Sequence, residues 1–288
     1  MQIGISIPTT EIGTDPVAIR DFAQAIEEMG YEHLTLIDHV LQSGTAVADD
    51  WRSFYTRANM FHEPLIFYAY LAALTTRSEL CTAILILPQR ATVLVAKQAA
   101  ELDLLSGGRL RLGVGIGWNK LEFDAMDQNF HNRGRRVGEQ IDVMRKLWTN
   151  ELVTFKGEWH NIEDSGINPL PVQRPIPVWI GAFIEPAIER AGRIADGWLA
   201  NPRVPPAQSQ AHFDIFREAA NAAGRDGDAL GIDVTVMTGD TGPQAWAAEA
   251  DAWKAMGATH LTVRTMASGL DSIDQHIETL RKFRQTYP

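Results

Sequence analysis

Strand-like and helix-like segments alternate along this chain, and this alternation constrains the fold more than any other feature of the sequence. Short apolar runs rich in Ile, Val and Leu each precede a segment whose apolar residues recur at helical spacing. The expected strands lie at 3–8, 33–38, 79–87, 109–117, 178–182, 197–201, 231–237 and 260–266. Strands that are joined through helices in this way form a parallel sheet.

Eight such units close most simply into a (β/α)8 TIM barrel, for which about 250 residues is the usual size. Residues 150–176 interrupt the alternation, with a hairpin pattern in VTFKGEWHNI and a proline-rich connection after it. We therefore predict a single barrel domain over residues 1–288, with an insertion at about 150–176 after the fourth helix. An open, doubly wound sheet is the alternative.

The stretch LSGGRLRLGVGIGWNKLEF (105–123) is unusually rich in glycine for a strand. It does not contain the dinucleotide-binding pattern G-x-G-x-x-G, because Trp118 and Lys120 occupy the positions of the last glycine. Gly113 is expected to fit a crowded barrel interior. Gly115 and Gly117 lie nearer the mouth, where they either fit the same interior or let a flat ligand lie against the backbone.

Composition excludes several classes of function. The net charge of −10 disfavours binding to nucleic acids or acidic membranes, whose charge would repel the protein. Cys81 is the only cysteine, the N-terminal segment reads as a strand, and no apolar run approaches the roughly 18 residues that span a bilayer. A cytoplasmic protein without a membrane segment is expected. The histidines are scattered, so no metal site is predicted.

Active sites of TIM barrels lie at the carboxyl ends of the strands. Asp38 and His39 end the second strand, and a histidine there can exchange a proton near neutral pH while its neighbour or a backbone group fixes its tautomer. The alternative is that both are ordinary polar residues of a strand end. Arg133, Arg135 and Arg136 open the fourth helix, where they would form either an anion site or a solvated charged face.

Several of these segments together resemble the luciferase-like monooxygenase superfamily, and more narrowly its branch that uses the deazaflavin coenzyme F420. The resemblance runs from Met1 to about residue 201. It rests on the glycine-rich stretch and on LIDHV (36–40), LPQR (87–90), AKQAAELD (96–103), PVWIGA (177–182) and ADGW (195–198).

The resemblance implies a barrel that holds F420 at the carboxyl ends of its strands, often as a homodimer, and that acts on a small molecule. Asp38 and His39 would lie beside the reactive ring, with His39 as proton donor or orienting group. The ring would rest on a bulge with a cis peptide bond in the third strand. The residues implied to contact the cofactor are Asp38, His39, Thr82, Ala83, Ile84, Gly115, Gly117, Trp118, Gly181, Ala182 and Arg135.

Trp118 departs from the sugar-phosphate dehydrogenase branch, which has an acidic residue at that position. We therefore expect a different, hydrophobic or planar substrate. Three alternatives stay open: an FMN-dependent monooxygenase that uses O2 and a partner flavin reductase, a flavin-binding barrel without catalysis, and a cofactor-free or metal-dependent barrel hydrolase or lyase.

Overall fold

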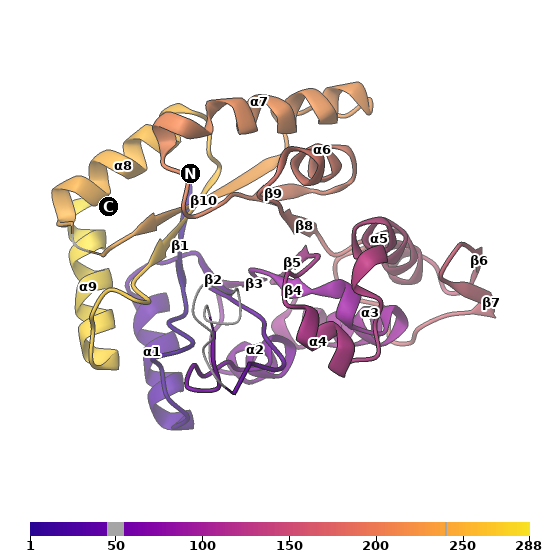
Figure 1. Ribbon diagram of the computed structural model, residues 1–288. Coiled ribbons are helices and arrows are strands. Elements are labelled where there is room, and N and C mark those ends of the chain that lie inside the picture. The colour runs from indigo at the N-terminus through magenta and orange to yellow at the C-terminus, as the bar shows by residue number, and fades with distance from the viewer. Residues whose placement is uncertain (45–54, 240) are drawn as a thin grey trace.

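The chain forms a closed barrel of parallel strands, seen in Figure 1 from the end where the strands finish. The computed structural model describes residues 1–44, 55–239 and 241–288. In this part of the chain the main sheet has nine strands, and every pairing between them is parallel. The architecture is the predicted (β/α)8 TIM barrel.

Pairing between distant segments closes the sheet. Strand β1 (Gln2–Ser6) lies between β2 (His33–Leu36) and β11 (His260–Arg264), so the two ends of the chain meet in the barrel. Strand β3 (Glu79–Thr82) pairs with β5 (Leu110–Gly115), which completes the circle. The remaining strands are β8 (Val178–Gly181), β9 (Gly197–Leu199) and β10 (Gly231–Met237).

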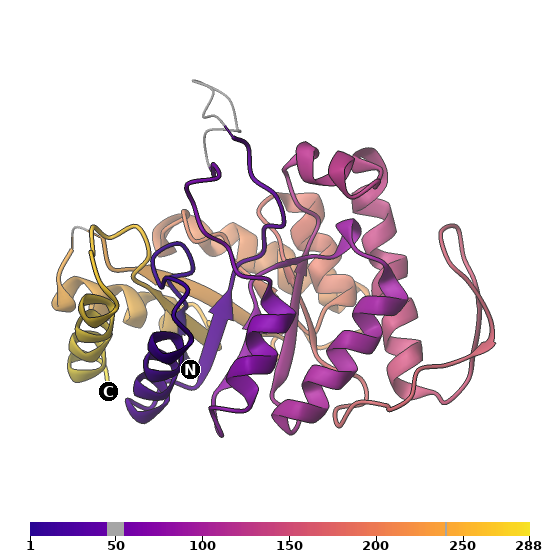
Figure 2. The same ribbon diagram turned by 90° about the horizontal axis from the view of Figure 1, so that it is seen from below.

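Helices surround the barrel (Figures 1 and 2). Asp15 caps the first of them by accepting a hydrogen bond from the Val17 N–H at 2.9 Å, and Gly107 ends the third in the left-handed region at φ 69°; aspartate and glycine are favoured at these two kinds of helix end. The helices that follow the strands are α1 (Pro16–Glu28), α2 (Pro64–Ala72), α3 (Thr92–Ser106), α5 (Arg133–Thr149), α6 (Glu185–Ile194), α7 (Pro206–Ala222), α8 (Pro243–Ala255) and α9 (Ile273–Thr286).

A short additional helix, α4 (Lys120–Ala125), occupies part of the segment that the sequence pattern predicts to be a loop. Asn119 caps it by accepting a hydrogen bond from the Leu121 N–H at 3.1 Å. Glu122 and Phe123 of this helix are fully buried. The helix therefore turns a carboxylate toward the interior at the mouth of the barrel.

The third strand is not continuous over 79–87, and that prediction from the apolar pattern is wrong. After β3 the chain bulges, resumes as the short β4 (Leu85–Ile86) and then turns into a 3-10 helix at Leu87–Gln89. The peptide bond between Ala83 and Ile84 is cis, as the resemblance implies. Gly113 makes room for this bulge, because a β carbon there would lie 1.9 Å from the carbonyl oxygen of Thr82.

The insertion contains the expected hairpin, formed by β6 (Val153–Lys156) and β7 (Asn161–Ser165). Its tip is tied to α5 by Glu139, whose carboxylate accepts hydrogen bonds from the backbone N–H groups of Glu158, Trp159 and His160 at 2.8–2.9 Å. The hairpin thus lies on the outside of the barrel, at the right of Figure 1, away from the strand ends.

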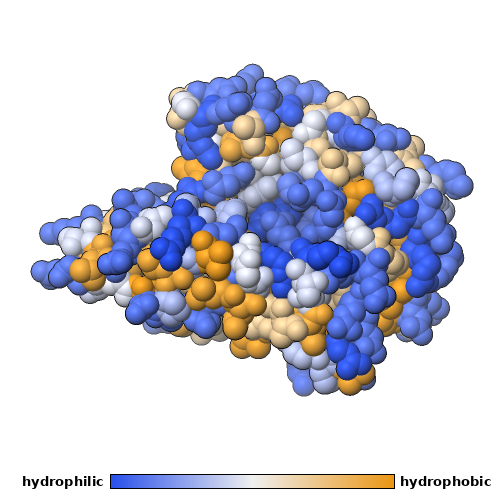
Figure 3. Space-filling model, turned by 180° about the vertical axis from the view of Figure 1, so that it is seen from behind, coloured by the Kyte–Doolittle hydropathy of each residue, from blue (hydrophilic) through white to orange (hydrophobic). Residues whose placement is uncertain are grey.

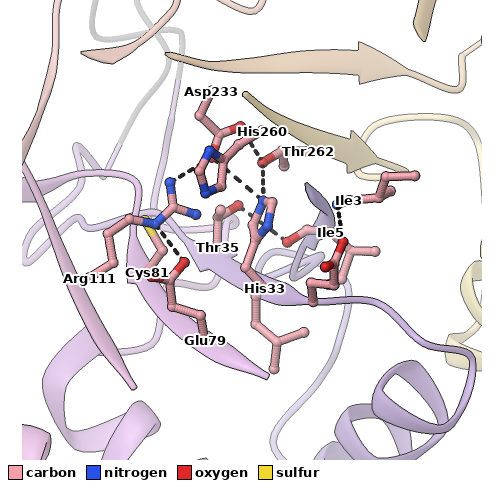
Figure 4. Close-up of polar contacts among 12 residues, drawn as sticks. Ile3, Ile5, His33, Thr35, Glu79, Cys81, Arg111, Asp233, His260 and Thr262 are labelled. Atoms are coloured by element: carbon pink, nitrogen blue, oxygen red, sulfur yellow. Dashed lines mark hydrogen bonds and ion pairs between the residues drawn. The ribbon is translucent and has the colours of Figure 1, made fainter. Parts of the chain in front are cut away.

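The part of the barrel interior near the amino ends of the strands is polar and charged (Figure 4). The buried guanidinium of Arg111 donates hydrogen bonds to Glu79 at 2.8 Å and to Asp233 at 3.1 Å, and it lies 4.3 Å above the ring of Trp179. Around this centre, Thr262 donates to Asp233 at 2.9 Å and lies 3.1 Å from the Nε2 atom of His33. Ionic contacts between β3, β5 and β10 therefore close the barrel from within.

None of the described helices combines the length and the apolar composition that a membrane crossing requires. On the face shown in Figure 3, hydrophilic side chains cover most of the surface, and hydrophobic ones gather in a limited area.

Glu27, in the last turn of α1, joins this helix to the turn between α2 and β3. Its carboxylate accepts backbone hydrogen bonds from Thr76, Arg77 and Ser78 at 2.8–3.1 Å. Burial alone would raise the pKa of Glu27, but these hydrogen bonds outweigh it and lower the pKa to about 2. A carboxyl whose pKa is lower in the folded state stabilises that state above its unfolded pKa, and loses the effect as the pH falls toward the folded value.

We expect Glu27→Gln to lower the free energy of unfolding at pH 7 by about 2 kcal/mol, since a neutral amide accepts these N–H groups less well. Urea unfolding of both proteins at pH 7, 4.5 and 3.5 measures the effect. The difference between them should shrink below pH 4.5, where the unfolded carboxyl becomes protonated. Glu28→Gln, at the exposed neighbouring position, is the matched control. A difference that stays constant with pH would contradict this role for Glu27.

Candidate functional site

A cavity of about 670 Å³ opens at the carboxyl ends of the strands, where the fold predicts the active site. Its walls contain residues from β1, β2, β5, β8, β9, β10 and β11 and from the loops that follow several of these strands. The residues of the predicted site that line it are Asp38, His39, Ala83, Ile84, Gly115, Gly117, Trp118, Gly181 and Ala182.

Two residues of the predicted site do not line the cavity. Thr82 is fully buried behind the wall, where its hydroxyl donates a hydrogen bond to the carbonyl oxygen of Gly113 at 2.7 Å. Arg135 has a side chain that is 75% exposed, and it lies on the outer surface 3.9 Å from Glu158. The structure therefore does not bring Arg135 to the cavity with the other residues of the predicted site, because the helix turns this side chain away from the barrel mouth.

The other two arginines of the basic triplet are also engaged without an anion. Arg133 donates to the carbonyl oxygens of Gly117 at 3.1 Å and Phe130 at 2.8 Å. Arg136 donates to the carbonyl oxygen of Pro88. These two side chains thus tie α5 to the loops that follow β4 and β5, and the triplet does not form the anion site that was weighed for it.

Ile84 forms a ledge on one side of the cavity, and two glycines hold it in place. A β carbon at Gly115 would lie 2.7 Å from the Ile84 side chain, and one at Gly181 would lie 2.6 Å from it. Both distances are too short for a real contact, so a side chain at either position would displace Ile84. Gly115 and Gly181 therefore make room for Ile84, which presents an apolar surface to the cavity.

His39 is held by a carboxylate that the sequence analysis missed. The Nδ1 atom of His39 lies 3.1 Å from Oε1 of Glu122, which also accepts the backbone N–H groups of Val40 at 3.0 Å and Leu41 at 3.2 Å. Oε2 of Glu122 accepts a hydrogen bond from Gln89 at 3.0 Å. Because the carboxylate acts as the acceptor, Nδ1 carries a proton, and Nε2 is the ring nitrogen left for a bound molecule.

The environment keeps Glu122 ionised. Its burial would raise the pKa, but the hydrogen bond and charge of His39, together with the hydrogen bonds of Gln89 and Leu41, lower the pKa below its ordinary value. The His39–Glu122 pair therefore places an oriented imidazole, a group that can act as an acid or a base, at the cavity wall.

Asp38 does not orient His39, although the two residues are adjacent. One oxygen of its carboxylate accepts the backbone N–H of Ile86 at 2.9 Å, and the other accepts Arg90 at 2.9 Å. Burial raises the pKa of Asp38, while the positive charge of Arg90 opposes that rise. Arg90 also binds Glu63 at 2.7 Å, so Asp38 fixes the bulged segment and the start of α2 rather than the imidazole.

Aromatic rings surround His39. The imidazole centre lies 5.1 Å from that of Tyr55, 4.9 Å from Phe61 and 5.4 Å from Trp118. Trp118 was expected to close over a planar or hydrophobic molecule, and it lies both in this cluster and on the cavity wall. Such a cluster limits the access of water to the histidine.

The described part of the chain contains no group of three or more His, Cys, Asp or Glu side chains that could hold a metal ion. Cys81 is fully buried, and burial raises the pKa of its thiol to about 12. The arrangement is therefore suited to proton exchange beside an apolar ledge, without a nucleophilic thiol.

Comparison with known proteins identifies the family of this chain. The chain matches the family model described as luciferase-like monooxygenase over residues 1–285. The F420-dependent glucose-6-phosphate dehydrogenase of Kineococcus radiotolerans is 30% identical over 215 residues, which are 73% of this chain and 60% of that protein.

Two solved structures share the fold. An F420-dependent secondary alcohol dehydrogenase, in complex with an F420–acetone adduct, has a TM-score of 0.83 at 16% identity, covering 100% of this chain and 99% of that one. The monooxygenase RslO1 of Streptomyces bottropensis has a TM-score of 0.80 at 20% identity, covering 100% and 98%. Since the family model covers nearly all of its residues, this chain belongs to the luciferase-like monooxygenase family.

Proposed function

We propose that this protein is an F420-dependent oxidoreductase that transfers a hydride between the deazaflavin and a small organic molecule. The His39–Glu122 pair on the wall of the cavity carries the proposal, because hydride transfer to a carbonyl or an activated double bond also needs a proton at the right place. The relative named as an F420-dependent dehydrogenase supports the choice of cofactor.

The cavity fits a flat heterocycle on its apolar side. Gly115 and Gly181 have no side chains, so the strands on either side of Ile84 place no larger group over it at these positions. Ala83 and Ile84 would support the ring, and the backbone at Gly181 and Ala182 would lie beside the phosphate-bearing tail. When bound, F420 supplies the carbon that gives or accepts the hydride.

In this proposal the residues of the chain manage the proton. Nε2 of His39 donates a proton to the reacting oxygen or carbon when the substrate is reduced, and it removes a proton when the substrate is oxidised. Glu122 keeps the imidazole in one orientation. Trp118, Tyr55 and Phe61 exclude water from this nitrogen.

Titration of the purified protein with F420 and, separately, with FMN tests the cofactor. We expect quenching of F420 fluorescence with a Kd in the micromolar range or below, and binding of FMN at least about tenfold weaker. A preference for FMN, together with O2 consumption in the presence of reduced FMN, would instead support a monooxygenase, the activity named for one structure of the same fold. Tight binding of F420 without transfer to any acceptor would indicate a non-catalytic carrier.

We expect His39→Ala to lower kcat roughly a hundredfold, the usual contribution of a general acid or base, while the Kd for F420 changes much less. Glu122→Gln should lower kcat by about tenfold, because a neutral amide holds the Nδ1–H group, and with it the orientation of the imidazole, less firmly than a carboxylate. Asp124→Asn, at an exposed position of the same helix α4, is the matched control. An unchanged kcat in His39→Ala would remove this residue from the mechanism.

We further propose that two copies of the chain associate through helices α2 and α3, which pack side by side. Large apolar side chains on these helices are exposed: Ile66 by 71% and Leu94 by 57%. Covering such residues removes apolar surface from water. The segment 40–63 was the expected contact, and its residues 45–54 lie outside the described part of the chain.

Light scattering during gel filtration tests this association. We expect a dimer for the unmodified protein, and a monomer for the double variant Ile66→Asp with Leu94→Asp, because burying two unpaired carboxylates is costly. Leu152→Asp changes a similarly exposed apolar residue in the turn between α5 and β6 and should leave the dimer intact. A dimer that survives both sets of changes would exclude this surface.

A further inference from the structure

Strand β11 turns every second side chain into the barrel. His260 and Thr262 face inward, since His260 packs against Trp179 with ring centres 4.8 Å apart and Thr262 donates to Asp233. Leu261 and Val263 are fully buried on the opposite side of the strand. Because side chains alternate along a strand, Arg264 follows His260 and Thr262 into the interior, and it lines the cavity.

The guanidinium of Arg264 has no protein partner among the described residues. Its Nε atom is enclosed and makes no hydrogen bond, and no carboxylate of that part of the chain lies within ion-pair distance. Arg90 and Arg111, which also belong to the barrel mouth and interior, each bind two carboxylates. An enclosed donor without a partner costs free energy, so a protein retains one where a ligand supplies the acceptor.

Two hydroxyl groups accompany Arg264 on the cavity wall. In the register of the sheet, Ser6 of β1 lies beside Arg264. Thr235 of β10 lies beside Thr262, which is the inward-facing residue of β11 that precedes Arg264. Both line the cavity, and within the described chain neither side chain makes a hydrogen bond of its own. Three neighbouring strands thus present a guanidinium and two free hydroxyls to the same space.

The negative charge below this group is already neutralised. Asp233 lines the bottom of the cavity, but it is bound by Arg111 at 3.1 Å and by Thr262 at 2.9 Å. In the sheet Asp233 is level with His260, four residues before Arg264, which is roughly 13 Å along a strand. Arg264 therefore has no internal counter-ion at hand, and its charge is available to a ligand.

We propose that Arg264, with the hydroxyls of Ser6 and Thr235, binds the carboxylate of the substrate, so that the substrate is an organic acid with an apolar body. A guanidinium presents two parallel N–H groups that match a carboxylate. The apolar body would lie against Leu199, which lines the same cavity. The identification of this ligand as the substrate rests on the proposed function.

The position of Arg264 in the barrel leaves separate places for the substrate and for the cofactor. Strands β11 and β5 lie opposite each other in the barrel, with three strand positions between them in each direction. Arg264 is therefore across the cavity from Gly115 and from the Ile84 ledge that would support the cofactor ring. An acid anchored at Arg264 would extend toward the ledge and toward His39, where the chemistry is proposed.

Calorimetric titration of the full chain with phenylacetate and with its neutral counterpart phenylacetamide tests the subsite. It is run on the chain alone and again with saturating F420, so that a failure of F420 binding does not affect the first series. We expect phenylacetate to bind about tenfold more tightly than phenylacetamide, a difference of about 1.4 kcal/mol. Arg264→Met should bring the two affinities to within about twofold, and Arg264→Lys should retain part of the preference.

The controls separate this subsite from other uses of the charge. Arg193→Met removes an arginine from the exposed surface of α6 and should keep the preference for phenylacetate. Inorganic phosphate is titrated in parallel, and tighter binding of phosphate than of phenylacetate would overturn the choice of a carboxylate. If Arg264→Met weakens F420 about tenfold while leaving phenylacetate unchanged, Arg264 holds the anionic tail of the cofactor and the proposal is wrong. Equal binding of acid and amide by the unmodified protein would also refute it.

Discussion

The ionic contacts of Arg111 are the constraint on which the rest of the barrel depends. A guanidinium that points into a closed barrel loses its hydration, so it must find acceptors from other strands. Glu79 and Asp233 provide them, and Trp179 covers the cationic face. Removing one partner of such a buried group commonly costs about 3–5 kcal/mol, because an unpaired charge remains. The group therefore fixes the relative positions of β3, β5, β8 and β10, and it closes the bottom of the cavity.

Above this floor the interior is asymmetric, and the asymmetry matches the proposed chemistry. On the side of β5 and β8, glycines allow the bulged third strand to fill the space and to present Ile84 as an apolar ledge. On the opposite side, β1, β10 and β11 present hydroxyls and the guanidinium of Arg264. His39 lies on the wall at β2, between the two sides in the order of strands. A planar cofactor and a charged substrate would thus lie against different walls of one cavity.

Much of the fold could be predicted from the sequence, because helix caps, apolar periodicity and strand length are local properties. Asp15, Pro16 and Gly107 mark helix ends in the structure as they do in the sequence. The bulge at Ala83 and Ile84 does not follow from the apolar run, which reads as one continuous strand; only the family resemblance implied it. Glu122 was missed for a different reason: it contacts His39 across 83 positions of sequence, and no local pattern reports such a contact. The position of Arg135 outside the cavity could not be predicted, because a cluster of charges does not reveal which way each side chain turns.

Glu122 does more than hold an imidazole. The same carboxylate binds the backbone of Val40 and Leu41, the first residues of the long connection that runs from β2 to α2. These contacts use main-chain N–H groups, so they do not depend on which side chains the connection carries. The start of the connection is therefore fixed beside His39 whichever side chains stand at Val40 and Leu41. Substitutions at these two positions would leave the contact between His39 and Glu122 in place.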